Sequence, residues 1–248
     1  MKQLQLEQLF KQLKAPNPGT LAKTMRHFAT KEAENRDKIV ADYFGQPAIK
    51  KIVDTIVEAL LASPKLPSNA KILDVGAGSG FFTVRVAKKV RAELPESSFY
   101  AMDLTPTMLL LLARKKAKIT PFVGIAENIE GSIRQAEKFF KIPRRFDAVF
   151  STLMLHHSTR PAKVFESIRK ALKKDGKAII VDLCEHNFEE FRTEMGDVYL
   201  GFKLRNIGKM AQKHFSTVRI RKIPAIRCES SGRSAEIFFA IMQNPARA

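Results

Sequence analysis

Tryptophan is absent from the sequence, and only two of its 248 residues are cysteines, Cys184 and Cys228. Neither cysteine has a partner at Cys-x-x-Cys spacing, so we predict no metal site and no disulfide framework. No run of about 18 apolar residues occurs, which excludes a hydrophobic membrane-spanning helix. The first residues also lack the apolar core and small-residue cleavage site of a secretory signal, and we therefore expect a cytoplasmic location.

Acidic residues are scarce, with 25 Asp and Glu against 43 Lys and Arg, so the net charge is +18. A basic surplus of this size is typical of proteins that bind nucleic acid or an anionic membrane surface. Residues 151–158, on the expected substrate side, nevertheless contain no Lys or Arg. Nucleic acid and peripheral membrane contact therefore stay open as partners, and neither is favoured. The composition, 45% hydrophobic and 27% charged, is that of a folded domain.

The most informative segment is 72–80, Ile-Leu-Asp-Val-Gly-Ala-Gly-Ser-Gly. Its apolar residues are typical of a buried parallel strand, and the glycines at 76, 78 and 80 allow a sharp turn with close approach to a ligand. Phe81 breaks the G-x-G-x-x-G spacing that is typical of dinucleotide sites, and a helix is expected from there to 93. A ligand whose positive amino group is drawn toward Asp74 fits the turn better than a pyrophosphate does.

A second carboxylate follows at the end of another short apolar strand, 98–103. Asp103 lies 23 residues beyond Gly80, and an acid about 20 residues past the glycine turn is placed to accept hydrogen bonds from a ribose. The alternative is a helix cap, a role for which Thr105 competes.

This strand, acid and glycine turn resemble the first motif of the class I S-adenosylmethionine-dependent methyltransferases. The resemblance implies S-adenosyl-L-methionine as cofactor and S-adenosyl-L-homocysteine as product, with the acid at 103 on the ribose. Many members carry an acid where Ile125 stands, so a side-chain contact to the adenine amino group is not expected here. The cofactor-binding residues that the resemblance implies are Asp74, Gly76, Ala77, Gly78, Gly80, Asp103, Leu104, Ala126, Glu127 and Ser151.

The order of expected elements agrees with the plan of this family. It predicts an α/β fold with a Rossmann-like, doubly wound, seven-stranded sheet: five parallel strands and a C-terminal hairpin whose last strand is antiparallel. The expected strands are 72–75, 98–103, 119–124, 146–151, 177–182, 215–223 and 235–242. We expect residues 1–66 to form a helical cover that belongs to the same domain as the S-adenosylmethionine-binding methyltransferase core, 67–248.

The N-terminal segment begins with an amphipathic, basic helix that carries Leu6, Leu9, Phe10 and Leu13 on one face. It could cover the cofactor cleft, touch anionic lipid or form a dimer contact. Tyr43 and Phe44 stand where family members place an aromatic ring against the cofactor, and core packing explains them equally well. A further helix is expected over 132–141, followed by a basic cluster at 141–145 that is consistent with a solvated insertion.

Histidines supply the candidate catalytic residues. Methyl transfer to a hydroxyl or an acidic carbon needs a base, and a neutral histidine is suitable. His156 and His157 follow the fourth predicted strand, and adjacent residues there cannot both face the site, so we predict His156 as the base. His186, after the fifth strand, is the competing candidate.

Other residue patterns limit the class of acceptor molecule that we expect. Residues 151–154 lack the Asn/Asp-Pro-Pro-aromatic pattern of amino-group methylation, and no cysteine nucleophile for cytosine stands in that loop. Segment 182–202 resembles the tail of a subgroup of ubiquinone/menaquinone-type, methyltransferase type 11 like enzymes, which implies a small-molecule acceptor. The predicted function is methyl transfer to an oxygen or carbon of a small molecule. The alternatives are an RNA or protein methyltransferase using the basic surface, and a cofactor-binding protein without catalysis.

Overall fold

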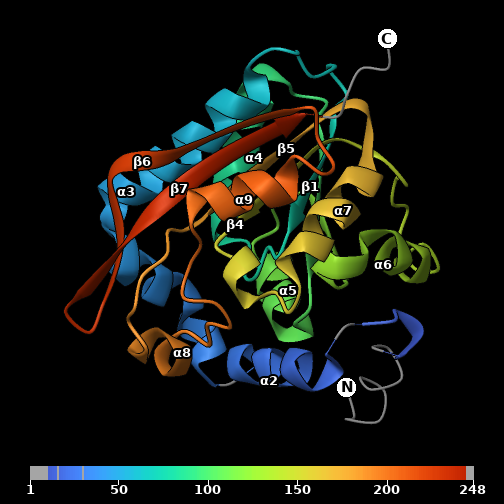
Figure 1. Ribbon diagram of the computed structural model, residues 1–248. Helices are drawn as coiled ribbons and strands as arrows, with labels where there is room; N and C mark the ends of the chain where they lie inside the picture. Colours follow the sequence, from blue (N-terminus) through green and yellow to red (C-terminus); the bar gives the residue numbers. More distant parts are fainter. Residues whose placement is uncertain (1–10, 16, 30, 244–248) are drawn as a thin grey trace.

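The computed structural model describes residues 11–15, 17–29 and 31–243, and it contains one seven-stranded sheet in the order β3-β2-β1-β4-β5-β7-β6 (Figure 1). The first five strands are parallel, and β7 runs antiparallel between β5 and β6. The predicted fold class is therefore confirmed. The strands are β1 Lys71–Val75, β2 Ser98–Asp103, β3 Ile119–Val123, β4 Phe146–Thr152, β5 Leu172–Leu183, β6 Thr217–Ser230 and β7 Arg233–Gln243.

Helices cover both faces of the sheet (Figure 1). The apolar side chains of α3 and α4 pack on one face, and those of α6, α7 and α9 pack on the other. Because both faces are covered, the central strands are apolar on both sides rather than alternating. The helices are α2 Pro18–Phe28, η1 Lys31–Asn35, α3 Arg36–Leu61, α4 Phe81–Glu93, α5 Pro106–Arg114, η2 Ala126–Asn128, α6 Ile129–Ala136, η3 Leu155–His157, α7 Pro161–Ala171, α8 Glu190–Glu194 and α9 Leu204–Ala211.

The boundaries of several elements differ from the predicted ones, mainly where polar residues interrupt the apolar pattern of a strand. β5 begins at Leu172 rather than at 177, because residues 173–175 are exposed and charged and do not have the pattern of a buried strand. The edge strand β6 likewise runs on to Ser230. The helix expected over 132–141 is α6, which begins earlier because Asn128 caps it by accepting a hydrogen bond from the backbone N of Gly131, at 2.9 Å.

The N-terminal segment is described only in part. Leu6, Leu9 and Phe10 of the expected first helix lie outside the described residues, whereas Leu13 is buried against Leu21 and Ile125. None of the described helices combines the length and the apolarity that crossing a lipid bilayer requires.

The topology locates the functional edge of the sheet. The chain moves outward from β1 through β2 to β3, and then returns to place β4 on the other side of β1. Loops leaving the carboxyl ends of β1 and β4 therefore diverge, and a crevice opens between them where α/β proteins of this kind bind ligands.

Candidate functional site

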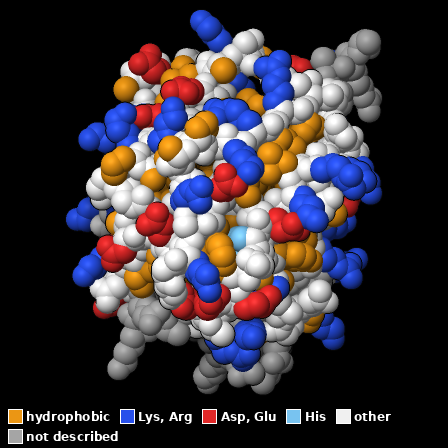
Figure 2. All heavy atoms as spheres, turned by 60° about the vertical axis from the view of Figure 1, so that its left-hand side comes forward, with side chains coloured by type: hydrophobic (Ala, Val, Ile, Leu, Met, Phe, Trp, Pro, Cys, Tyr) orange, Lys and Arg blue, Asp and Glu red, His pale blue; other side chains and the backbone are white. Residues whose placement is uncertain are grey.

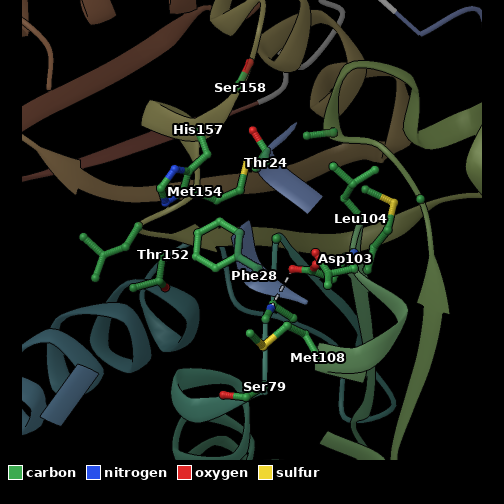
Figure 3. Close-up of a pocket in the computed structure, with 18 of the residues that line it drawn as sticks. Thr24, Phe28, Ser79, Asp103, Leu104, Met108, Thr152, Met154, His157 and Ser158 are labelled. Carbon is green, nitrogen blue, oxygen red and sulfur yellow. Dashed lines mark hydrogen bonds between the residues drawn. The ribbon is translucent and has the colours of Figure 1, made fainter. Parts of the chain in front are cut away.

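A cavity lies at the carboxyl ends of β1, β2 and β4, and α2 and the start of α3 form its opposite wall. Figure 3 shows Thr24 and Phe28 of α2 near Asp103, Met154 and His157. The lining is Leu21, Thr24, Phe28, Arg36, Val40, Gly76, Ala77, Gly78, Ser79, Phe81, Phe82, Met102, Asp103, Leu104, Thr105, Met108, Gly124, Ile125, Ala126, Glu127, Thr152, Leu153, Met154, His157 and Ser158.

The glycine turn after β1 forms the floor of this cavity. The backbone N–H groups of Gly76 and Ala77 both donate to the carbonyl of Met102, at 2.8 and 3.1 Å, and so fasten the turn to the end of β2. Gly76 has φ +76°, and a Cβ there would come within 2.0 Å of Met154. At Gly78, φ +54°, a Cβ would meet no atom within 4 Å. The glycine at 78 thus leaves open space beside the backbone, which is the property a close-fitting ligand requires.

Asp103 closes the end of β2 and lines the cavity. One carboxylate oxygen accepts a hydrogen bond from the backbone N of Gly78, at 2.7 Å, and the other accepts from the backbone N of Thr105, at 2.8 Å. Burial raises the pKa of Asp103, and these backbone hydrogen bonds oppose that rise. Thr105, the competitor for the helix-cap role, occupies the N-cap of α5, although its side chain makes no capping hydrogen bond.

Asp74 lies beneath the glycine turn and does not line the cavity. Its side chain is buried, and one oxygen accepts a 2.6 Å hydrogen bond from the hydroxyl of Thr83. The other oxygen has no hydrogen-bond partner among the described residues. Burial raises the pKa of Asp74 to about 7.

The loop after β3 forms a second wall. Ile125, Ala126 and Glu127 line the cavity together with Leu104, so three of the predicted cofactor residues gather here. The Glu127 carboxylate faces the next loop, where one oxygen accepts hydrogen bonds from the backbone N and hydroxyl of Thr159 and from the hydroxyl of Ser158. Glu127 therefore joins the loops that follow β3 and β4.

The predicted residue Ser151 has a different position. Its hydroxyl is buried and donates to the carbonyl of Val75 at 2.8 Å, which ties β4 to β1 beside the turn. The next three residues, 152–154, line the cavity instead. Leu153 has φ +56°, a conformation that is rare for a branched side chain and that marks a strained loop at the site.

His156 is buried behind the cavity wall. Its Nδ1 lies 2.6 Å from a carboxylate oxygen of Asp182, and its Nε2 lies 3.5 Å from Asp197. Burial lowers the pKa of His156, but the negative charges of Asp182 and Asp197 outweigh burial, and the pKa is raised. His156 therefore lies between two carboxylates and does not line the cavity.

His157 is the histidine that lines the cavity (Figure 3). Its Nδ1 lies 3.2 Å from the carbonyl of Gly196. A carbonyl oxygen can only accept, so Nδ1 carries the proton and Nε2 keeps its lone pair. Burial, followed by the positive charges of His156 and Arg36, lowers the pKa of His157 well below its ordinary value. His157 is a neutral imidazole at physiological pH.

His186 does not line this cavity. Its ring stacks on Phe188, with ring centroids 5.0 Å apart, and meets Phe191 edge-on. The backbone N of Phe188 donates to Nδ1, at 3.2 Å. Burial lowers the pKa of His186. These contacts are those of a side chain that packs the loop after β5 against α8.

One group of side chains has the donor types of a metal site. Among the described residues, His156, His157 and Asp197 each offer one ligand atom, and these atoms lie within 4.8 Å of one another. Neither oxygen of Asp197 has a hydrogen-bond partner there, and burial raises its pKa to about 6. The raised pKa of His156 and the nearby charge of Arg36 both oppose a bound cation.

Sequence reasoning missed the residues that α2 and α3 contribute. Leu21, Thr24, Phe28, Arg36 and Val40 line the cavity from segments without a motif. The only signal for them is the helical spacing of 21, 24 and 28 on one face of α2. The two aromatics singled out earlier lie elsewhere: Tyr43 lines a smaller adjoining pocket, and Phe44 packs against the core beneath α3.

Similar proteins share this architecture. Residues 66–219 match the model of a family described as a methyltransferase domain. The highly reducing polyketide synthase g433 from Fusarium sp is 27% identical over 163 residues, which cover 62% of this chain and 6% of that protein. The demethylmenaquinone methyltransferase of Thermotoga maritima is 25% identical over 171 residues, covering 68% and 65%. The chain thus spans less than two thirds of either relative's length.

A solved structure, Haemonchus contortus phosphoethanolamine N-methyltransferase 2 in complex with S-adenosyl-L-methionine, superposes with a TM-score of 0.63 at 18% identity. The superposition covers 90% of this chain and 60% of the other. At this identity the likeness concerns the fold, and the match over 66–219 carries the family assignment. The chain belongs to the methyltransferase domain family and has the fold of the class I S-adenosylmethionine-dependent methyltransferases.

Proposed function

We propose that this protein binds S-adenosylmethionine and transfers its methyl group to an oxygen or a carbon of a small-molecule acceptor, leaving S-adenosylhomocysteine. One observation carries the proposal. A single cavity at the carboxyl ends of β1 and β4 holds a glycine turn with open space at Gly78, the carboxylate of Asp103 and the neutral imidazole of His157. Together these groups form a binding surface for a nucleoside, with a proton-accepting side chain beside it.

The residues present fit this cofactor. The Asp103 carboxylate is suited to the ribose hydroxyls, and the apolar Leu104, Ile125 and Ala126 are suited to the adenine ring. The open space beside the backbone at Gly78 would let the methionine portion lie against the turn. Asp74 lies below the turn, outside the lining of the cavity, so we assign it no contact with the cofactor amino group. When bound, the cofactor supplies an electrophilic methyl group on a sulfonium leaving group.

His157 is the proposed base. Nε2 would take the proton of an acceptor O–H or acidic C–H as the acceptor oxygen or carbon is methylated. The cofactor, when bound, would supply the methyl group and keep the electron pair of the carbon–sulfur bond on its leaving sulfur. The Gly196 carbonyl fixes the tautomer that this requires. His156, the base expected from sequence, has Nδ1 bound to Asp182 and Nε2 directed at Asp197, so we assign it a supporting role.

The cover contributes orientation and exclusion of water. Leu21 and Phe28 of α2, with Met108 and Met154, make much of the wall apolar. An in-line methyl transfer gains most of its rate from holding the two reacting atoms at contact distance in a site from which water is excluded. A cavity roofed in this way favours a small, largely apolar acceptor over a polymer.

The distribution of charge agrees with a small acceptor. Figure 2 shows Lys and Arg side chains spread over the face it presents, with Asp and Glu side chains between them. Among the ion pairs of the described residues are Lys222–Glu236 and Arg192–Glu189. A continuous basic track, which a nucleic-acid-binding surface needs, is not what this face presents.

Calorimetric titration of S-adenosylhomocysteine into the wild type and into Asp103→Ala tests the cofactor assignment. We expect micromolar binding by the wild type, weakened by about 1.5 kcal/mol or more in the variant, which is the size of a lost hydrogen bond to a charged group. A panel of phenols, quinols and activated carbon acids with labelled cofactor then tests the acceptor class. Turnover on RNA alone, with binding that falls steeply with salt, would contradict the small-molecule proposal.

A further inference from the structure

Arg36 is the one arginine among the described residues that line the cavity. It is the first residue of α3, and its guanidinium carbon lies 5.0 Å from the centre of the Phe28 ring. The neighbouring Asp37 fixes this turn of the helix, because it accepts hydrogen bonds from the hydroxyl of Ser79 and the ammonium of Lys115, both at 2.5 Å. Arg36 is thereby held beside the glycine turn.

The donors of this guanidinium are available to a ligand. No hydrogen bond or ion pair joins Arg36 to another residue in the described part of the chain, although the side chain has five N–H donors. Asp103 is near enough to feel its charge, but both oxygens of that carboxylate accept backbone hydrogen bonds. Asp197 also lies in its field without forming an ion pair.

An unpaired cation in a partly buried, mostly apolar wall is costly to keep, because its lost hydration is not replaced. An anionic group of a ligand would replace the lost hydration. Arginine is also the side chain whose planar fork matches a carboxylate through two parallel hydrogen bonds.

We propose that Arg36 is the anion-binding residue of the cavity and pairs with a carboxylate of the bound ligand. This inference rests on the proposed function, which supplies two sources of a carboxylate: the amino-acid end of the cofactor and an acidic group on the acceptor. The tie between Asp37 and Ser79 places Arg36 beside the glycine turn, where the amino-acid end of the cofactor would lie.

Two nucleosides separate these sources. S-Adenosylhomocysteine carries the amino-acid carboxylate, whereas 5′-methylthioadenosine has the same adenine, ribose and thioether without it. Each is titrated calorimetrically into wild type, Arg36→Met and Arg36→Lys. Lys38→Met is the matched control, because it removes an equal charge from the same helical turn, where the side chain does not line the cavity.

If the cofactor carboxylate pairs with Arg36, Arg36→Met should weaken the binding of S-adenosylhomocysteine at least tenfold. The same substitution should change the affinity for 5′-methylthioadenosine less than twofold. Arg36→Lys should recover part of the loss, and Lys38→Met should match the wild type. Equal weakening of both nucleosides, with a lowered melting temperature, would assign Arg36 to the fold and overturn the proposal.

If Arg36→Met changes the affinity for neither nucleoside, propionate is titrated into wild type and Arg36→Met, both saturated with S-adenosylhomocysteine. Saturable binding to wild type that is lost in Arg36→Met assigns the residue to an acidic acceptor, and equal behaviour of the two proteins overturns the proposal. Failure of wild type to bind either nucleoside contradicts the proposed function instead. Propionate titrated into the ligand-free proteins then tests Arg36 by itself.

Discussion

Replacing Asp74 with asparagine is expected to make the ligand-free protein more stable at neutral pH. The carboxyl group is buried, only one of its oxygens has a partner among the described residues, and burial raises its pKa to about 7 from 3.8. As pH rises from about 4 to 7, the unfolded chain releases this proton while the folded protein retains it. The unfolded state then binds fewer protons, so the wild type loses stability with rising pH.

The magnitude follows from the shift in pKa. About 3 pH units at 1.36 kcal/mol each correspond to about 4 kcal/mol, of which roughly 2.5 kcal/mol falls between pH 5 and pH 8. The amide introduced by Asp74→Asn would not titrate, and its oxygen could still accept from the hydroxyl of Thr83. The difference in unfolding free energy between Asp74→Asn and wild type should therefore grow by about that amount from pH 5 to pH 8.

Urea unfolding of both proteins at pH 5, 6, 7 and 8 measures this difference, and comparing slopes with pH cancels any constant effect of the substitution. Thr83→Val is the matched control, since it removes the hydroxyl that donates to the carboxyl group and should steepen the loss of stability with pH. Parallel profiles for wild type and Asp74→Asn would refute the argument that Asp74 stays protonated in the folded state.

Four further outcomes are expected. Asp103→Asn should weaken S-adenosylhomocysteine more than tenfold by calorimetry, because the charge at the ribose site is removed. His157→Gln should lower turnover by about 10²- to 10⁴-fold while leaving cofactor affinity unchanged, with His186→Gln as the near-neutral control. Because the pKa of His157 is far below its ordinary value, wild-type turnover should stay level on acidification to below pH 6.5. Lys177→Met should lower the unfolding free energy by about 2 kcal/mol in urea titrations, since the buried ammonium donates to three carbonyls at the end of α3.

The strands and the glycine turn could be predicted because their signals are local. Helix α4 and strand β2 have the predicted boundaries, since apolar runs and turn residues decide them within a few positions. Asp103 could be placed for the same reason: in a parallel sheet, adjacent strands end at one edge, and the acid ends the strand beside the glycine turn. Strand β5 was only partly predicted, because residues 173–175 are charged and exposed and lie in a register shift between the pairs Phe146–Leu172 and Ala148–Lys177.

Tertiary structure alone decided which side chains reach the cavity. His156 and His157 are adjacent in sequence, but the 3-10 turn η3 directs one toward Asp182 and the other toward the cavity, and Asp182 comes from another strand. Arg36 belongs to no recognisable sequence motif. Its position depends on the hydrogen bond between Asp37 and Ser79, which are 42 residues apart in the sequence. The sequence by itself therefore determined the sheet, the turn and the acid at its edge, which follow from local residue preferences. The orientation of the histidines and the charge of the cavity wall depend on contacts between distant segments, and only the folded structure decided them.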